Sequence, residues 1–203
     1  MSMTDVVEHW PVVSSAELVR GRIFTVRTDK VRMPDNELAE RDVVTHPGAV
    51  AVLALDDAGR VLMIRQYRHP VGYLLWEIPA GLRDVDGEAP WATAQRELVE
   101  EAGYRAGDWR VLADYYSSPG YSTERLRVYL ARDLVQVPES ERDFVPVAEE
   151  AFLLPGWLPL DEAVRKVFAG ELHNGVAALA VLAGYAARSQ GFDGLRPADA
   201  PEL

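Results

Sequence analysis

Residues 81–104 read GLRDVDGEAPWATAQRELVEEAGY, and this stretch predicts both a helix and the chemistry that the helix carries. A proline near the start, good helix formers after it and a glycine just beyond the end predict a helix over residues 90–102. Glu97, Glu100 and Glu101 are spaced by three and four residues, so their carboxylates project from one face of that helix. The adjoining face is apolar and can pack on a sheet; its members are Trp91, Ala94, Leu98 and Ala102.

The acidic face of this helix predicts a site for a hard divalent cation. Like-charged pairs on a helix repel each other by about 0.2–0.5 kcal/mol each. A cation removes that penalty, and oxygen ligands suit Mg²⁺ or Mn²⁺ rather than zinc. An acidic turn taken alone is more often a solvated surface. Here, however, the acidic residues belong to a pattern that specifies the residue type at eight positions. A sequence window matches such a pattern by chance in fewer than roughly one in 10⁸ cases. The eight positions are Gly81, Glu88, Arg96, Glu97, Leu98, Glu100, Glu101 and Gly103.

The pattern resembles the Nudix box, and the resemblance implies a hydrolase of nucleoside diphosphates linked to another group. Carried over position by position, it implies that Glu97, Glu100 and Glu101 bind the metal. The backbone carbonyl of Ala80, beside the box, matches a further metal-binding position. Metal ions held there would neutralise charge on the phosphates and acidify the attacking water.

The same resemblance implies structural roles for the other residues of the box. Arg96 and Glu88 match the pair that braces the loop and the helix, and Gly81 and Gly103 match the glycines that bound the segment. The loop between Gly81 and Glu88 holds six residues, one more than in the usual box. Because the spacing from Glu88 onward is intact, the insertion lengthens the loop without moving the metal-binding face.

Composition and charge are consistent with one enzymatic domain. A chain of 203 residues, 48% of them hydrophobic, can bury one substantial core. The net charge of −11 argues against nucleic acid as a main partner. There is no cysteine, hence no disulfide framework. The sequence at the N-terminus lacks the features of a signal peptide, and residues 175–187 are too short to span a bilayer comfortably. We therefore expect a cytoplasmic protein without a membrane partner.

Strand-like segments dominate the first half of the chain, and two helices lie near its end. The expected strands are residues 22–31, 38–45, 49–55, 61–67, 73–78, 109–116, 125–131 and 151–158. Residues 79–81 are expected to form a turn between the strand at 73–78 and the box. The late helices are expected at residues 160–169 and 175–188. This order predicts an α/β fold in which helices flank a mixed sheet. The resemblance sharpens the expectation to a Nudix-like α/β/α sandwich preceded by N-terminal antiparallel strands.

Three parts of the chain are expected to differ in role. Residues 1–46 form an N-terminal strand extension, and residues 47–190 form the Nudix hydrolase domain. Residues 191–203 contain Gly, Pro and Asp and predict a loosely ordered tail.

Motifs flanking the box resemble the ADP-ribose pyrophosphatase branch of the family. They are QYRHP at 66–70, LWEIPAGL at 75–82 and SSPGYSTERLRVYLA at 117–131. The branch implies hydrolysis of ADP-ribose to AMP and ribose 5-phosphate. It also implies a homodimer in which the N-terminal strands are exchanged and line the partner's adenine pocket. Neighbouring branches that act on other sugar nucleotides share QYR and PAG.

The general base is expected on a loop beyond the box. In the branch it resembles a glutamate on a mobile loop, and the matching stretch VPVAEEAFLLPGW at 145–157 offers two candidates. We favour Glu150 and keep Glu149 as the alternative. Ordinary carboxylates on a solvated loop are the competing interpretation of this pair.

Four further residues are candidates for binding the substrate. Arg68 resembles the arginine that contacts the diphosphate, and a guanidinium suits bidentate phosphate binding. Glu77 could hydrogen-bond the substrate or the neighbouring loop. Phe24 and Trp76 are flat apolar side chains on which adenine could stack, although core packing is the commoner fate of such residues.

Two other functions remain open at this level. Within the enzyme class, the alternative substrate is another nucleotide sugar or a dinucleotide such as NADH. Outside it, the alternative is a non-catalytic Nudix-like nucleotide sensor. Such sensors tend to have a degraded box, whereas this box retains every carboxylate. The four histidines lack metal-ligand spacing, and no GxSxG, P-loop or GxGxxG segment is present.

Overall fold

The structure, a computed structural model, describes residues 3–142 and 153–202. The chain divides into two compact units. The first takes in the chain up to Gly48 together with Tyr116–Arg125. The second contains Ala49–Tyr115 and the chain from Leu126 onward.

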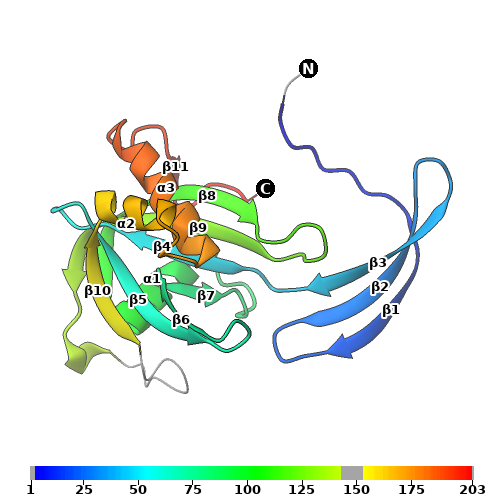
Figure 1. The fold of residues 1–203 in the computed structure, drawn as a ribbon, viewed down its shortest axis with the longest axis horizontal. Helices are drawn as coiled ribbons and strands as arrows, with labels where there is room; N and C mark the ends of the chain where they lie inside the picture. The colour runs from blue at the N-terminus through cyan, green and yellow to red at the C-terminus, as the bar shows by residue number, and fades with distance from the viewer. Residues whose placement is uncertain (1–2, 143–152, 203) are drawn as a thin grey trace. The chain divides into compact units, whose positions relative to one another are not determined.

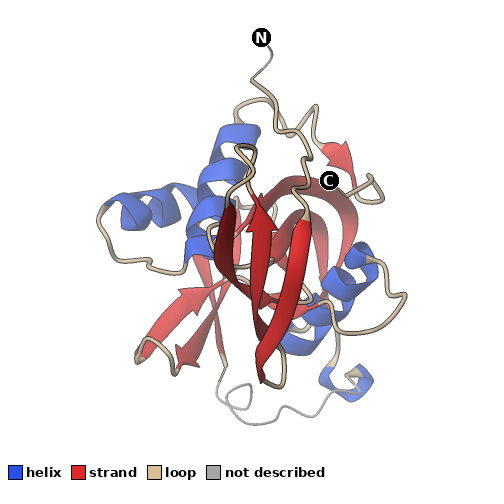
Figure 2. Ribbon diagram, turned by 90° about the vertical axis from the view of Figure 1, so that its right-hand side faces the viewer, coloured by secondary structure: helices blue, strands red, loops and turns tan. Residues whose placement is uncertain are grey.

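The first unit is built on a three-stranded antiparallel sheet. Its strands are β1 (Val12–Arg20), β2 (Thr25–Arg32) and β3 (Leu38–Thr45), with β2 in the middle. Figure 2 shows the three strands side by side. The sequence predicts β2 and β3, but β1 was missed because VVSSAELVR has no alternation of apolar and polar residues. Every residue of β1 is exposed, so no buried face imposes such an alternation.

A distant segment completes the first unit. The residues between Tyr116 and Arg125 return to the end of β3, where the amide of Thr123 donates to the carbonyl of Val44 at 2.9 Å. The Val44 amide in turn donates to the carbonyl of Tyr121 at 2.7 Å. These backbone bonds fix a loop that lies more than seventy positions away in the sequence.

The second unit contains a five-stranded mixed sheet. Its order is β11-β8-β9-β4-β7, in which β4 runs parallel to β9 and antiparallel to β7. All six residues of β4 are buried, which is why AVAVLA is continuously apolar. The strands are β4 (Ala49–Ala54), β7 (Ala80–Leu82), β8 (Tyr104–Tyr116), β9 (Arg125–Gln136) and β11 (Arg196–Pro197).

A second, three-stranded sheet lies within the same unit. It is antiparallel, with β5 (Arg60–Arg68) between β10 (Leu154–Pro159) and β6 (Tyr73–Glu77). Figure 1 shows β10, β5 and β6 next to one another in this order. A short 3₁₀ helix, η1 (Glu139–Glu141), follows β9.

Helices pack on both sides of the strands. α1 (Pro90–Ala102) buries Ala94 and Leu98 in one hydrophobic core, against β4, β8 and β9. α2 (Leu160–Phe168) and α3 (Gly175–Arg188) bury their apolar residues in a second core, formed with β4, β5 and β9. The predicted α/β/α sandwich with a mixed sheet is thus confirmed (Figure 1). In the described part of the chain, no helix has the length and apolarity needed to span a membrane.

Two local predictions were wrong. Trp91 was expected on the packing face of α1, but it is 37% exposed, and Thr93 is buried on that helix instead. Thr93 can be buried because its hydroxyl has a polar partner: it donates a hydrogen bond to the carboxylate of Glu88 at 2.8 Å. Residues 79–81 were expected to form a turn, but Ala80 and Gly81 belong to β7 because they pair with Ala51 and Val50 of β4.

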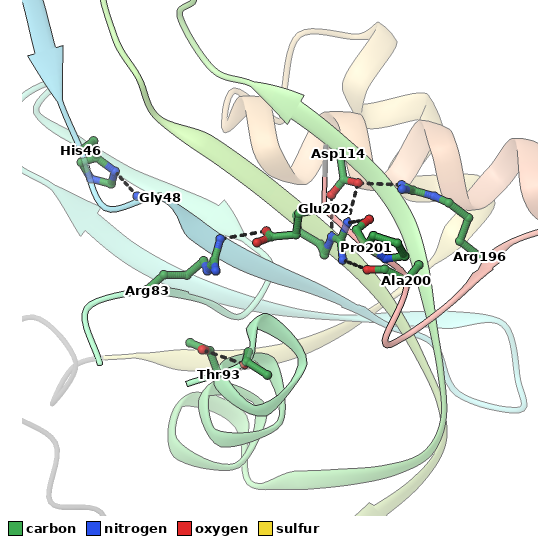
Figure 3. Close-up of polar contacts among 11 residues, drawn as sticks. His46, Gly48, Arg83, Thr93, Asp114, Arg196, Ala200, Pro201 and Glu202 are labelled. Carbon is green, nitrogen blue, oxygen red and sulfur yellow. Dashed lines mark hydrogen bonds and ion pairs between the residues drawn. The ribbon is translucent and has the colours of Figure 1, made fainter. Parts of the chain in front are cut away.

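The segment expected to be a loosely ordered tail makes defined contacts in the second unit. Arg196 and Pro197 pair with β8, and the Arg127 guanidinium donates to the carbonyls of Ala200 and Pro201 at 2.6 and 2.9 Å. Figure 3 shows these contacts. The pairing with β8 and the contacts to Arg127 are made by the backbone of the segment, and side-chain patterns in the sequence do not predict such contacts.

Arg127 is the principal buried charge of this sheet. It is 2% exposed and forms two hydrogen bonds with Asp114, at 2.7 and 2.9 Å. Burial by itself raises the pKa of the Asp114 carboxyl, but hydrogen bonds from Arg127 and Arg196 outweigh it and hold that pKa below its ordinary value. The ion pair is therefore charged on both sides and depends on both partners.

Replacement of Arg127 by Met should lower the free energy of unfolding by about 3 kcal/mol, because it leaves a buried carboxylate with one partner fewer. Urea denaturation followed by circular dichroism measures the change. The matched control is Arg110→Met, since Arg110 is half exposed and pairs with Asp108 at 3.2 Å. That substitution should cost less than about 1 kcal/mol. Equal losses in the two variants would contradict the assignment.

Candidate active site

The acidic face of α1 is fixed by how the helix begins, packs and ends. Pro90 occupies the first turn, and Gly103 ends the helix in the left-handed conformation with a φ of 72°. The positive φ favours glycine at this position, and the guanidinium of Arg142 lies where a Cβ would be. With Leu98 buried below, Glu97 and Glu101 are directed toward the neighbouring strand β7.

Strand β7 lies directly against two of these carboxylates. The amide of Ala80 donates to Oε2 of Glu101 at 2.8 Å. A Cβ built on Gly81 would lie 2.1 Å from the carboxylate carbon of Glu97, so only glycine allows this approach. The backbone of β7 and the carboxylates of α1 therefore form one continuous polar surface. It includes Ala80, whose carbonyl is a predicted metal ligand.

Arg96 links the remaining carboxylates of the box. Its Nη1 donates to Glu97 at 2.7 Å and to Glu100 at 3.1 Å. Its Nε and Nη2 contact the two oxygens of Glu88 at 3.4 and 3.3 Å. Burial disfavours the charged guanidinium, but Glu88, Glu97 and Glu100 raise the pKa of Arg96 above its ordinary value. One cation thus contacts three neighbouring anions, which leaves a net negative charge on this cluster.

Glu88 is held from two sides, since the Thr93 hydroxyl reaches the same carboxylate that binds Arg96. Hydrogen bonds from Arg96 and Thr93 lower the pKa of Glu88 below its ordinary value. Sequence reasoning missed Thr93, although a hydroxyl residue five positions after Glu88 at the start of a helix is a usable signal. It also missed Arg142 behind Gly103, for which the sequence offers no signal.

The donor chemistry of this surface fits a hard divalent cation. Three carboxylates and a backbone carbonyl supply oxygen ligands, and the close fit of Gly81 over Glu97 keeps the ligands near β7. Among residues 3–142 and 153–202, no three acidic or histidine side chains are already arranged as a metal cluster. Instead, the guanidinium of Arg96 lies between Glu97 and Glu100. The predicted ligands Ala80, Glu97, Glu100 and Glu101 remain a prediction that this surface supports.

Arg68 and Glu77 are brought together by β5 and β6. Nε and Nη2 of Arg68 donate to the two oxygens of Glu77 at 2.9 and 2.6 Å. Glu77 is only 3% exposed, whereas the Arg68 side chain keeps 44% of its surface exposed. The bidentate pair therefore aims the guanidinium and shields the carboxylate. This geometry favours Glu77 as the residue that orients Arg68.

The two aromatic candidates lie in different units of the chain. Phe24 belongs to the first unit, is 40% exposed and contacts Gly21. Trp76 belongs to the second unit and is 38% exposed. With Trp157 it lines a cavity of about 390 Å³ between β6, β10 and α2. Their predicted roles in stacking adenine stay predictions, and Glu149 and Glu150 lie outside the described residues.

Comparison with protein families agrees with this geometry. Residues 45–179 match the family model described as NUDIX domain. Residues 10–44 match the model described as nucleoside diphosphate sugar hydrolase N-terminal domain. The chain belongs to the Nudix family, as the box predicts. Members of this family generally use divalent metal ions.

Two relatives are similar to the chain in sequence, and one solved structure is similar to it in fold. The chain is 48% identical over 95% of its length, and 91% of the relative, to a protein from Mycobacterium tuberculosis named ADP-ribose pyrophosphatase. It is 34% identical over 83% of its length, and 89% of the relative, to a Bacillus subtilis protein of the same name. A solved structure titled as an ADP compounds hydrolase shares the fold, with a TM-score of 0.72 at 23% identity. That match covers 93% of this chain and 99% of the other.

Glu88→Gln should lower the free energy of unfolding at pH 7 by about 1–3 kcal/mol, because it removes a charged acceptor. The folded-state pKa of Glu88 lies below its unfolded value. Its contribution is therefore complete above about pH 4.3 and is lost as the pH falls through the folded pKa. Urea titrations at pH 7 and at acid pH should give curves that converge at low pH.

The control for this prediction is Glu139→Gln, which removes an exposed carboxylate from η1. It should leave the stability at pH 7 nearly unchanged. A difference between wild type and Glu88→Gln that is the same at both pH values would contradict the charged role of Glu88.

Proposed function

We propose that this protein is a metal-dependent pyrophosphatase that hydrolyses ADP-ribose to AMP and ribose 5-phosphate. The observation that carries the proposal is the box surface, where Glu97 and Glu101 lie against β7 and Arg96 joins Glu97 to Glu100. The choice of ADP-ribose is supported by the two relatives that carry this activity in their names.

The residues of this chain divide the work of breaking a P–O–P bond. A divalent ion, which we propose is Mg²⁺ or Mn²⁺, supplies neutralisation of phosphate charge and acidification of water when bound. Glu97, Glu100 and Glu101, with the Ala80 carbonyl, are the proposed ligands. Arg96 and Glu88 hold the box in place. Water adds to one phosphorus, the bridging oxygen leaves with the other phosphate, and a carboxylate takes up the proton of the water.

Arg68 is the proposed contact for the diphosphate. The protein carries a net charge of −11, which opposes binding of an anionic substrate unless local cations compensate. The guanidinium of Arg68 is oriented by Glu77 and stays partly exposed, and its planar shape suits bidentate contact with phosphate oxygens. Phe24 and Trp76 are the proposed stacking partners of adenine.

A substrate panel tests the proposal. With Mg²⁺ or Mn²⁺, ADP-ribose should give AMP at a higher kcat/KM than UDP-glucose, GDP-mannose or NADH give their monophosphates. Glu97→Gln should lower kcat by about 10²–10³, comparable to the loss of one preorganised electrostatic contact, while the circular dichroism spectrum stays unchanged. Preference for another nucleotide sugar or for NADH would replace the substrate. Binding of ADP-ribose without turnover would favour the sensor.

Glu150 is the proposed general base, with Glu149 as the alternative. A base acts mainly in the transition state, so Glu150→Gln should lower kcat by about 10²–10⁴ with little change in KM. Steady-state kinetics on both single variants distinguishes the two residues, since each serves as the control for the other. A larger loss in Glu149→Gln would exchange their roles, and full activity in both variants would remove the base from this loop.

We further propose a homodimer formed through residues 1–46 as the N-terminal extension, with residues 47–190 as the catalytic domain. Strand β1 supports this proposal. It forms the edge of its sheet, is exposed throughout and carries exposed apolar residues such as Val12 and Leu18. Exposed apolar edge strands commonly pair with another chain. Cytoplasmic localisation, without a nucleic-acid or membrane partner, completes the proposal.

A further inference from the structure

Residues 196–202, named here the strap, connect opposite edges of the five-stranded sheet. The strap begins as β11, which pairs with the outer side of β8. It ends with Glu202, whose carboxylate accepts a hydrogen bond from Nη1 of Arg83 at 2.8 Å. Arg83 directly follows β7, the strand at the other edge of the sheet. Figure 3 shows Glu202 and Arg83 joined in this way.

Between its ends, the strap is fixed to the sheet at several points. Arg196 donates to Asp114 at 2.8 Å, and the same carboxylate binds Arg127. Arg127 in turn holds the carbonyls of Ala200 and Pro201. Ala198 and Ala200 pack against the hydrophobic core that also contains α1. The strap is therefore anchored over β8 and β9 before it reaches Arg83.

The anchor and the box glycine lie in one row across the sheet. Val50 of β4 is in register with Arg127 of β9 on one side and with Gly81 of β7 on the other. Residues in register on neighbouring strands place their side chains on the same face. The face of Gly81 is the one that meets Glu97 of α1. Arg127, which anchors the strap, and the approach of Glu97 to Gly81 thus lie on the same face of this row.

Strand β7 needs support beyond its own ladder. It has three residues and, among the strands that the structure describes, it pairs only with β4 at the edge of its sheet. Its inner end is held by the bond from Ala80 to Glu101. Its outer end leads into Arg83, which meets Glu202. The side chains of that pair are 22% and 23% exposed, so their contact is largely shielded from solvent.

We propose that the strap positions the catalytic box through the Arg83–Glu202 ion pair. Arg83 and Glu202 are positioning residues: they hold the end of β7, and β7 is the strand against which the carboxylates of Glu97 and Glu101 lie. This inference rests on the proposed function in one respect, which is that these carboxylates bind the metal. Neither positioning residue belongs to the box pattern, and Glu202 lies about one hundred positions from the ligands it serves.

The experiment compares Arg83→Gln, Glu202→Gln and the double variant with the wild type. Calorimetry with Mn²⁺ should show an affinity about tenfold weaker in each single variant, the lower end of what an outer-shell partner typically contributes. The double variant should be no worse than either single one, because both remove the same interaction. Arg83→Lys, which keeps the charge, should restore most of the affinity.

Hydrogen exchange gives a second readout that needs neither metal nor substrate. Amides of residues 80–83 should exchange faster in Glu202→Gln, while those of β5 should not change. The matched control is Glu171→Gln, which breaks an ion pair of similar length, 2.7 Å to Lys166 of α2. It should alter neither Mn²⁺ affinity nor exchange in residues 80–83.

Each outcome decides the proposal. Unchanged exchange in residues 80–83, or additive losses of Mn²⁺ affinity in the double variant, would overturn it. If the wild type itself binds no Mn²⁺, the proposed function fails. Hydrogen exchange in residues 80–83 then tests by itself whether the strap holds β7. If ADP-ribose proves to be the wrong substrate, both readouts still apply, because neither uses a substrate.

Discussion

The proposed active site depends on the contact between one helix and one short strand. Glu97 and Glu101 of α1 reach the backbone of β7, where Ala80 donates a hydrogen bond and Gly81 leaves room for a carboxylate. Carboxylates brought this close repel each other unless cations lie between them. Arg96 supplies one such cation, and a divalent ion is the other that the chemistry of the site favours. The requirement for positive charge is thus built into the packing of α1 on β7.

The rest of the second unit holds these two elements in place. β4 is buried along its length and carries β7 on one side and β9 on the other. The two hydrophobic cores press helices onto opposite faces of the strands. Glu77 fixes the orientation of Arg68, the proposed diphosphate contact, because its buried carboxylate accepts hydrogen bonds from the guanidinium. Rigid elements therefore support the residues proposed to meet metal and diphosphate.

Some parts of the fold were readable from local patterns. The span of α1 follows from proline, helix formers and a final glycine, and α3 occupies the residues 175–188 that the sequence predicts. Strands with a buried face or a clear turn were also found, such as β4. β1 was missed because it has no buried face, and β7 because three residues carry no periodicity. Trp91 was wrongly expected on the packing face of α1. The helical pattern does not show that Thr93 is buried there with Glu88 as its hydrogen-bond partner.

What the sequence determined by itself is the chemistry of the box. The spacing of the charged residues places carboxylates and a guanidinium on adjacent turns of one helix, which is a local property of the chain. These residues are Arg96, Glu97, Glu100 and Glu101. Only the tertiary structure decided what these groups meet. The pairing of β4 with β7 and the ion pair between Arg83 and Glu202 of the strap connect residues about 30 and 119 positions apart, and the pairing of β5 with β6 brings Arg68 to Glu77. Such contacts arise from backbone pairing and burial, which no local pattern of residues encodes.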